Sequence, residues 1–321
     1  MKLGDNLNFI TYDQLNKDIY RNLHKLPLDI DLIVGIPRSG ILVAAIIALY
    51  RNLPFTDIDT LLSGRIFNTG GTRKNKRWIK SLDEAKHILI VDDSISSGEA
   101  MKSAKKQINL LDLNCKKTYC AVYALPTNLM SVDVFFKICN HPRMFEWNYL
   151  HHWGLKYACV DIDGILCEDP NYMENDDSKS YERFLTNARP RIIPTQPIGY
   201  LVTCRLEKYR SKTELWLKKY GVQYDHLIML NAPDAITRLR EFNQGEFKGA
   251  IYKKTNCFIF IESSYEQAID ICSIAKKPVF CTENNQLIHS NEIHAHVSNL
   301  VNDWRITSKR VARKLLIKLL K

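Results

Sequence analysis

Two adjacent carboxylates, Asp92 and Asp93, follow directly on the apolar residues 88–91. A turn rich in serine and glycine comes next, at residues 94–98, and leads into a helical pattern. A short apolar run bounded by turn residues predicts a buried strand, and ligands of open α/β sheets bind at the carboxyl ends of such strands. The turn offers backbone N–H groups and hydroxyls to an anion, while paired acids suit vicinal hydroxyls. The stretch therefore predicts a site for a sugar phosphate.

A second pair of acids, Asp161 and Asp163, ends another apolar run and precedes Gly164. At a strand end this spacing lets Asp161 and the main chain of Asp163 face one ligand, while the Asp163 carboxylate approaches it from the other side. Apolar runs that end in Thr203 and in Glu262 follow, with lysines between them. Together these ordered segments predict a second site of chemistry.

Strands and helices alternate along the part of the chain that must position the first acid pair. The pattern predicts a helix at 9–26, a strand at 31–35, a helix at 41–50, a helix at 100–111, and strands at 117–125 and 132–139. Such alternation is typical of a parallel, doubly wound sheet. The turn at residues 36–40 exposes backbone amides and the cation of Arg38, which suits a diphosphate.

The stretch at residues 87–100 resembles the diphosphoribosyl-binding motif of type I phosphoribosyltransferases, which has four apolar residues, two acids, three variable residues, Thr or Ser, and Gly. Two positions depart from the motif. Ala100 stands where a second Thr is usual, and Ser96 stands where purine-salvage members carry an Asp that faces the base. The second departure disfavours a purine acceptor.

This resemblance implies a donor, phosphoribosyl diphosphate (PRPP), used together with Mg²⁺. It assigns the ribose hydroxyls to Asp92 and Asp93. The expected phosphate and diphosphate contacts are Arg38, Ser39, Gly40, Arg73, Ser94, Ser96, Ser97 and Gly98. Arg73 belongs to a basic, glycine-rich segment, residues 61–80, which predicts either a lid over the diphosphate or an ordinary surface loop.

The acceptor of this family is often contacted just after the last strand of the sheet. Arg143, Glu146 and Trp147, which flank Phe145 in that position, are therefore acceptor candidates. A hydrophobic linker between two domains is the alternative interpretation of the same residues.

The second set of acids resembles motif one of the haloacid dehalogenase (HAD) superfamily of phosphatases. This resemblance implies that Asp161 attacks phosphorus and that Asp163 protonates the leaving alcohol and then activates water. Thr203 and Lys248 would bind the phosphoryl oxygens, with Lys253 as the alternative to Lys248. Mg²⁺ held by Asp161, Asp163 and Glu262 would offset the charge, although Asp is commoner than Glu at the last position.

The insert between Gly164 and Leu201 is short and polar, so a large cap domain would not fit there. A phosphatase of this kind has an open site that accepts bulky or polymeric phosphoesters. The segment 205–217 resembles the phosphatase half of polynucleotide-repair enzymes, but the likeness is too local to name a nucleic-acid substrate.

Composition sets the limits of the whole chain. With 321 residues, 45% hydrophobic residues and 25% charged residues, a soluble protein of about two domains is expected. The net charge of +10 favours anionic partners. Nine scattered cysteines without a CxxC pair, and a polar N-terminus, predict a reducing cytoplasm.

The last eighteen residues, 304–321, carry seven cations and no acid. On a helix they would have one apolar and one basic face, which predicts either peripheral contact with an anionic membrane at its inner face or a terminal helix docked on the protein. The predicted domains are a phosphoribosyltransferase at 1–150, a HAD-like phosphatase at 151–300 and a basic amphipathic helix at 301–321. Each domain is expected to be α/β, with a mostly parallel sheet and helices on both faces.

The order of the two domains predicts a bifunctional enzyme. The first site would place 5-phosphoribosyl on an acceptor, and the second would remove the 5-phosphate, leaving a ribofuranosyl residue. A glycan or lipid-linked glycan acceptor in polysaccharide biosynthesis fits this order. Alternatives are a nucleobase phosphoribosyltransferase coupled to a nucleotidase, and a PRPP-sensing regulatory protein. Nucleic acid is not an expected partner, and the oligomeric state stays open.

Overall fold

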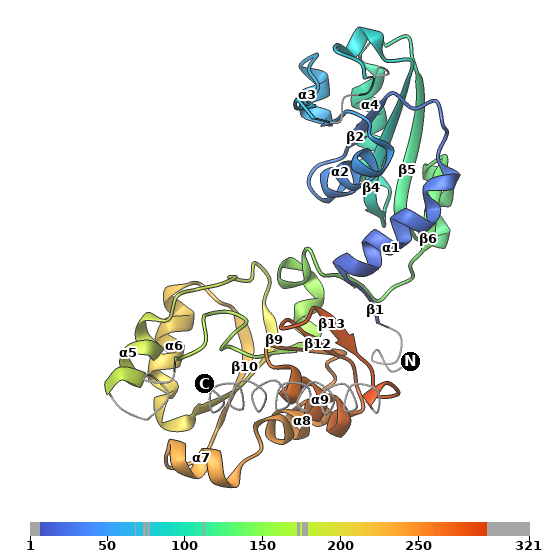
Figure 1. Ribbon diagram of the computed structural model, residues 1–321. Coiled ribbons are helices and arrows are strands. Elements are labelled where there is room, and N and C mark those ends of the chain that lie inside the picture. The colour runs from blue at the N-terminus through green and yellow to red at the C-terminus, as the bar shows by residue number, and fades with distance from the viewer. Residues whose placement is uncertain are drawn as a thin grey trace, which may run out of the picture. The chain divides into compact units, whose positions relative to one another are not determined.

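The computed structural model describes residues 7–67, 69–72, 75, 78–111, 113–171, 174 and 179–293 of the chain. The chain divides into two compact units, which are described separately. One is Ile10–Trp147, and the other joins Met1–Phe9 to Asn148–Lys321 (Figure 1). The predicted PRPP contact Arg73 and the predicted C-terminal helix at 301–321 lie outside the described residues.

The unit Ile10–Trp147 is built on a five-stranded sheet of order β3-β2-β4-β5-β6, in which every neighbouring pair is parallel. Its strands are β2 (Leu32–Gly35), β3 (Phe55–Asp57), β4 (His87–Ile95), β5 (Lys116–Ala124) and β6 (Val134–Ile138). Its helices are α1 (Tyr12–Asn22), α2 (Ser39–Arg51), α3 (Ile58–Leu62) and α4 (Glu99–Asn109), with 3-10 turns η1 (Leu23–Lys25), η2 (Leu82–Glu84) and η3 (Pro126–Ser131). The short strands β1 (Asn8–Ile10) and β7 (Arg143–Phe145) precede α1 and follow β6.

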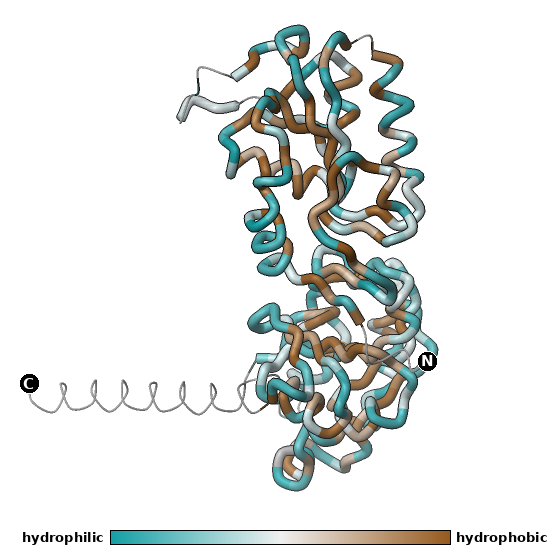
Figure 2. Tube along the Cα trace, turned by 90° about the vertical axis from the view of Figure 1, so that its right-hand side faces the viewer, coloured by the Kyte–Doolittle hydropathy of each residue, from teal (hydrophilic) through white to brown (hydrophobic). Residues whose placement is uncertain are grey.

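Alternate residues of the central strand β4 point into two separate hydrophobic cores. Leu89 and Val91 pack with α1 and α2, whereas Ile88 and Ile90 pack with α3 and α4. The sheet is therefore covered by helices on both faces, and its strands are buried apolar runs, as expected for a parallel sheet. Figure 2 shows hydrophobic segments running through the strands of each unit.

The predicted helix at 9–26 begins later than expected, because residues 8–10 are extended. Thr11 is the N-cap of α1, and its hydroxyl accepts a hydrogen bond from the backbone N–H of Gln14. A threonine in this position satisfies an N–H group that lacks an intrahelical partner, so it fixes where the helix starts.

The second unit contains a six-stranded sheet of order β10-β9-β8-β11-β12-β13 in its described part. All neighbouring pairs are parallel except β12 and β13, which are antiparallel. The strands are β8 (Ala158–Val160), β9 (Ile198–Leu206), β10 (Tyr224–Leu230), β11 (Ile259–Glu262), β12 (Val279–Cys281) and β13 (Gln286–Ile288). The helices are α5 (Lys179–Asn187), α6 (Arg210–Lys219), α7 (Ala235–Glu241), α8 (Gln244–Lys254) and α9 (Tyr265–Ala275), with 3-10 turns η4 (Tyr149–His151), η5 (Trp153–Tyr157) and η7 (Glu207–Tyr209).

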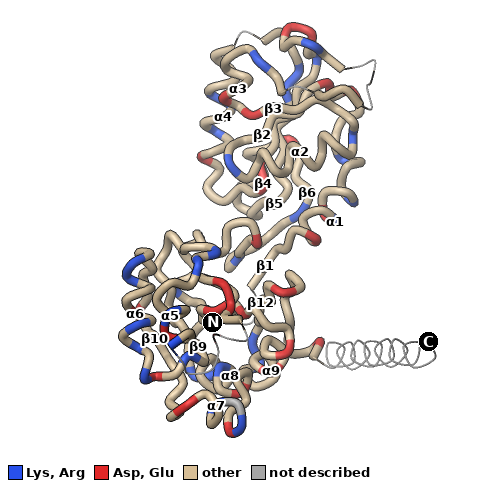
Figure 3. The backbone as a smooth tube through the Cα atoms, turned by 60° about the vertical axis from the view of Figure 1, so that its left-hand side comes forward, with Lys and Arg blue, Asp and Glu red and all other residues tan. Residues whose placement is uncertain are grey.

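The prediction of an α/β protein with mostly parallel sheets flanked by helices is confirmed. Basic residues lie on outer helices such as α6, whereas acidic residues also gather inside the second unit (Figure 3). Within the described ranges, no helix is both long enough and apolar enough to span a membrane.

Candidate active sites

The first acid pair lies inside β4 rather than after it, because the strand continues to Ile95. Asp92 and Asp93 are only 7% and 6% exposed. Both therefore need polar partners, since a buried carboxylate without any is costly.

The predicted diphosphate turn lies directly against this acid pair. The backbone N–H of Ile36 donates to the carbonyl of Val91 at 3.0 Å. A Cβ at Gly40 would stand 2.7 Å from the Val91 oxygen and 3.2 Å from Oδ1 of Asp92, so only glycine permits this approach. Arg38 is exposed at the start of α2, and the Pro37–Arg38 peptide is cis. The structure thus brings the turn at 36–40 and the acids together, as the sequence predicts.

The serine-rich turn at 94–98 leads into α4 through Gly98, whose φ of +79° favours glycine. The hydroxyl of Ser96 lies 3.3 Å from Nε2 of His141, and the side-chain amide of Asn128 donates to the carbonyl of Ser96. Two segments far along the sequence therefore support the turn. Nothing in the spacing of His141 and Asn128 indicated this role.

The two acids of β4 are joined by hydrogen bonds. The backbone N–H of Asp93 donates to Oδ1 of Asp92 at 2.9 Å, and Nε1 of Trp147 donates to Oδ2 of Asp93 at 2.8 Å. Burial and the neighbouring charge of Asp93 raise the pKa of Asp92 to about 8. Burial also raises the pKa of Asp93, against the opposing effect of its hydrogen bonds. The buried pair therefore binds a proton more readily than two exposed carboxylates would.

The three acceptor candidates have different surroundings. Arg143 is 4% exposed; its Nη1 donates to the Cys139 carbonyl at 3.4 Å, and burial lowers its pKa. Its side chain is thus directed into the protein, and its contact with an acceptor stays a prediction. The Glu146 carboxylate accepts the Tyr12 backbone N–H at 2.7 Å and so binds the first turn of α1. Trp147 contacts Asp93 directly.

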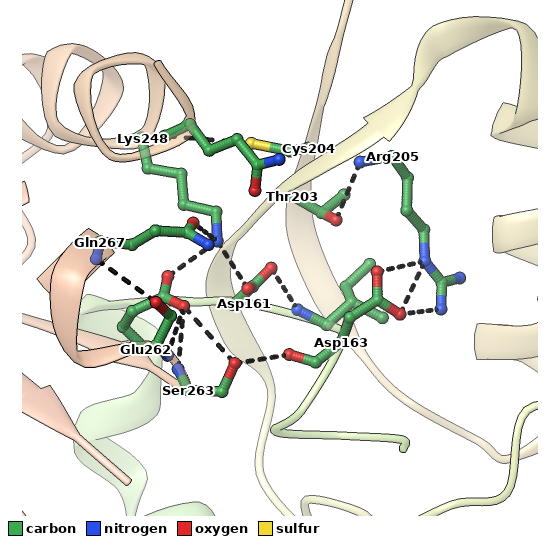
Figure 4. Close-up of polar contacts among 12 residues, drawn as sticks. Asp161, Asp163, Thr203, Cys204, Arg205, Lys248, Glu262, Ser263 and Gln267 are labelled. Carbon is green, nitrogen blue, oxygen red and sulfur yellow. Dashed lines mark hydrogen bonds and ion pairs between the residues drawn. The ribbon is translucent and has the colours of Figure 1, made fainter. Parts of the chain in front are cut away.

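The second candidate site centres on Lys248, which α8 buries to 2% exposure. Its ammonium donates to Asp161 at 2.6 Å, to Glu262 at 2.8 Å and to the amide oxygen of Gln267 at 2.9 Å (Figure 4). Lys253, the alternative lysine, is exposed on the same helix. The structure therefore brings Lys248 to the acids and leaves Lys253 outside.

Asp163 is held by an arginine that the sequence did not single out. Nη2 of Arg205 donates to Oδ1 of Asp163 at 2.6 Å, and Nε donates to Oδ2 at 3.1 Å. The thiol of Cys167 also contacts this carboxylate, at 3.4 Å. The hydroxyl of Thr203 accepts the Arg205 backbone N–H at 3.2 Å. Figure 4 shows the Asp163 side chain directed at Arg205, away from Lys248.

The predicted metal ligands are Asp161, Asp163 and Glu262, with the main chain of Asp163 facing the same ligand as Asp161. Within the described ranges, no group of three or more His, Cys, Asp or Glu side chains is arranged to hold a metal. The Asp163 carboxylate is instead paired with Arg205. Asp161 and Glu262 do converge on one point, where the ammonium of Lys248 lies. Two carboxylates that converge on a cation are oxygen donors suited to Mg²⁺, and the Asp163 carbonyl, 3.1 Å from Oγ of Ser263, is a further oxygen.

Burial controls the charges at this second site. Burial raises the pKa of Asp161 to about 8, with Glu262 and Asp163 adding to the effect and Lys248 opposing it. The same carboxylates raise the pKa of Lys248, so the lysine stays protonated. One fixed cation thus holds two buried acids together.

A cavity of about 620 Å³ opens beside these residues. Besides predicted residues, its wall includes Asp169, Tyr181, Arg191, Arg238 and Gln267. The first three come from the short, polar insert between β8 and β9, whose residue pattern did not indicate a place in the site. Glu266 is exposed, and Asp270 pairs with Asn243, so neither adds an acid to the cluster around Lys248.

Comparison with known proteins bears on the first unit. Residues 9–151 match the family model of the phosphoribosyl transferase domain. A hypoxanthine/guanine phosphoribosyltransferase of Methanothermococcus okinawensis is 29% identical over 115 residues, which cover 34% of this chain and 63% of that protein. These matches confirm the predicted resemblance to phosphoribosyltransferases for this part of the chain. The match spans less than two thirds of that relative's length.

Two solved structures are also similar. The xanthine-guanine-hypoxanthine phosphoribosyltransferase of Helicobacter pylori has 17% identity and a TM-score of 0.33, over 44% of this chain and 92% of its own. The purine phosphoribosyltransferase of Pyrococcus horikoshii has 18% identity and a TM-score of 0.33, over 46% of this chain and 94% of its own.

Proposed function

We propose that the chain performs two consecutive reactions. The first site transfers 5-phosphoribosyl from PRPP to an acceptor, and the second hydrolyses the 5-phosphate to leave a ribofuranosyl residue. The observation that carries this proposal is the convergence of Asp161, Glu262 and Lys248 beside a cavity, in the same chain as a phosphoribosyl transferase domain.

In the first reaction the leaving diphosphate would lie on the turn at 36–40, which contacts Val91 and Asp92 of β4. Asp92 and Asp93 would accept hydrogen bonds from the ribose hydroxyls, and the turn at 94–98 would bind the 5-phosphate through its N–H groups and hydroxyls. Mg²⁺ bound with PRPP would offset the negative charge of the diphosphate as it leaves. The buried acid pair is suited to this role because a bound cation favours the ionised form of both carboxylates.

In the second reaction Asp161 would attack phosphorus, and the cation of Lys248 and the hydroxyl of Thr203 would bind the phosphoryl oxygens. Asp161 is already held in one orientation by its contact with Lys248 and by the N–H group of Ile162 at 2.8 Å. Asp163 would protonate the leaving oxygen and later take a proton from water. Since Asp163 is paired with Arg205, this role requires that the ion pair loosen when the substrate binds.

Asp161 and Glu262 would hold Mg²⁺ at the second site, together with the main-chain oxygen of Asp163. When bound there, the metal would supply positive charge against the phosphoryl group. Lys248 would then have to move from the position between the two carboxylates toward the phosphoryl oxygens.

The acceptor we favour is a glycan or lipid-linked glycan at the cytoplasmic face of a membrane. Ser96 stands at the position where an Asp would face a purine, and its hydroxyl lies against His141. Removal of the 5-phosphate would also convert a newly made nucleotide to a nucleoside, so it would not serve nucleotide synthesis. Synthesis of a ribofuranose-containing polymer from PRPP needs both steps. The second candidate is a nucleobase acceptor coupled to a nucleotidase, which the similarity to a hypoxanthine/guanine phosphoribosyltransferase favours.

The test is incubation of the protein with labelled PRPP, Mg²⁺ and panels of glycans and free nucleobases. Wild-type protein should convert a glycan to a ribosylated product, and Asp161→Asn should accumulate its phosphoribosylated form. Asp92→Asn should form neither product. Turnover of a free base faster than any glycan would favour the second candidate, and release of no diphosphate with any acceptor would count against both.

A further inference from the structure

The geometry points to a new role for Trp147. We propose that it is a positioning residue of the donor site, whose indole N–H fixes Asp93 in the orientation that receives the ribose of PRPP. This inference rests on the proposed function only in taking Asp92 and Asp93 as the ribose-binding pair. It replaces the expectation that Trp147 contacts the acceptor.

The contact is short and protected from solvent. Nε1 of Trp147 donates to Oδ2 of Asp93 at 2.8 Å, and only 6% of Asp93 is exposed. A hydrogen bond to a buried charged group is stronger than one between neutral groups, because water does not compete for the carboxylate. The other hydrogen bonds to Asp93, from the Asp92 carboxyl and the Ser94 backbone, come from its own strand. Trp147 therefore ties Asp93 to a different part of the unit.

The indole is itself held in place. Its ring stacks on Phe145 with centroids 4.8 Å apart and an angle of 18°, and Phe145 packs on Tyr123 at 5.7 Å. The Tyr123 hydroxyl donates to the buried carboxylate of Asp18 at 2.9 Å. A continuous row of contacts thus runs from α1 across the sheet to Asp93. Because each ring is fixed by the next, the indole N–H is presented to Asp93 before any ligand binds.

This arrangement restricts the orientation of the Asp93 carboxylate. Oδ2 is occupied by the indole, so the carboxylate cannot rotate freely about its side-chain bonds. A carboxylate fixed in advance binds a hydroxyl without the loss of side-chain entropy that ordering it would cost. Loss of the N–H should therefore weaken donor binding, while the acceptor, which Trp147 is not expected to touch through this group, should bind as before.

The experiment compares Trp147→Phe with wild type by calorimetric titration of Mg·PRPP, which requires no acceptor. Phe keeps a stacking ring and removes the N–H. The matched control is Trp153→Phe, the same change at a tryptophan that is 54% exposed in the other unit. We expect about tenfold weaker PRPP binding for Trp147→Phe, because the loss of one hydrogen bond to a charged group corresponds to roughly this factor. The control should bind PRPP as wild type does. Urea unfolding checks that both variants are folded.

A second comparison separates positioning from a merely structural effect. In an Asp93→Asn background, Trp147→Phe should weaken PRPP binding by less than twofold, because the carboxylate it acts on is gone. In turnover with an acceptor, Trp147→Phe should raise the KM for PRPP and leave the KM for the acceptor unchanged. Unaltered PRPP binding in folded Trp147→Phe, or a raised acceptor KM alone, would overturn the inference. Failure of wild-type protein to bind Mg·PRPP would instead contradict the proposed function.

Discussion

The two acid clusters of this chain solve the same electrostatic problem in opposite ways. In the first unit Asp92 and Asp93 lie side by side in β4, where the backbone N–H of Asp93 and the indole N–H of Trp147, both neutral groups, donate to their carboxylates. In the second unit Asp161 and Glu262 share the ammonium of Lys248, and Asp163 has Arg205. Buried acids must either hold protons or be paired with cations.

This difference in the partners of the acids indicates which ligand each site would bind. The first pair is partly protonated when empty, so it suits a ligand that brings its own cation, such as a metal-bound diphosphate. The second cluster already contains cations, so its carboxylates are ordered by ion pairs before the proposed phosphoester binds. A neutral ligand would gain little from either arrangement.

The largest effect should follow from removing the cation of the second cluster. Lys248→Met leaves Asp161 and Glu262 buried without a counter-charge, and breaking a buried pair in this way costs about 3–5 kcal/mol. We expect the second unit to unfold at a much lower urea concentration than in wild type. Phosphate release should also be lost. The exposed Lys253→Met is the matched control and should change neither. Equal effects of the two variants would contradict the assignment of Lys248.

Gly40→Ala tests the close contact of the first site. The added Cβ would meet the Val91 carbonyl at 2.7 Å, so either the turn or the strand end must shift, at a cost of about 1–3 kcal/mol. We expect weaker binding of Mg·PRPP by titration, with no change in the phosphate release proposed for the second site. The control is Gly71→Ala, because no atom lies within 4 Å of a Cβ there. Normal PRPP binding by Gly40→Ala would show that the turn does not set the donor site.

The raised pKa of Asp92 predicts that the first unit becomes less stable as pH rises. The pKa of Asp92 is raised to about 8, so its stabilising protonated form is fully present below pH 4 and is lost as pH rises through 8. Asp92→Asn removes this titration. The variant should therefore gain about 4 kcal/mol relative to wild type between pH 5 and pH 8.5, because the loss in wild type is about 1.4 kcal/mol for each pH unit up to pH 8, measured by unfolding without ligand. A pH-independent difference would mean that Asp92 is ionised when empty.

The smallest effect concerns the third partner of Lys248. Gln267→Leu removes one acceptor from the ammonium and leaves the two carboxylates in place, so a loss of about 1 kcal/mol is expected. Phosphate release should fall severalfold, because the lysine is less well oriented. The control Gln286→Leu, at an exposed position of β13, should be neutral. If Gln267→Leu were as severe as Lys248→Met, the carboxylates would not be the main partners.

Much of the fold follows from local sequence. Apolar runs that end in acids mark β4, β8 and β11, because a buried parallel strand must be apolar along its length and polar where it emerges. The turn at 36–40 and the acid pair come together as expected, since carboxyl ends of neighbouring parallel strands share one edge. Even here the strand extended past the acids to Ile95, which no residue pattern indicated.

Partners from distant segments were decided by the tertiary structure alone. The sequence does not distinguish Lys248 from Lys253. Five residues along a helix correspond to one full turn plus about 140°, so the two side chains lie on different faces and only Lys248 faces the acids. Arg205 pairs with the Asp163 carboxylate, and Trp147 donates a hydrogen bond to Asp93. Sequence thus determined which strand ends carry acids, because that depends on neighbouring residues. Folding decided which cation or donor meets each acid, because that depends on where helices and loops pack.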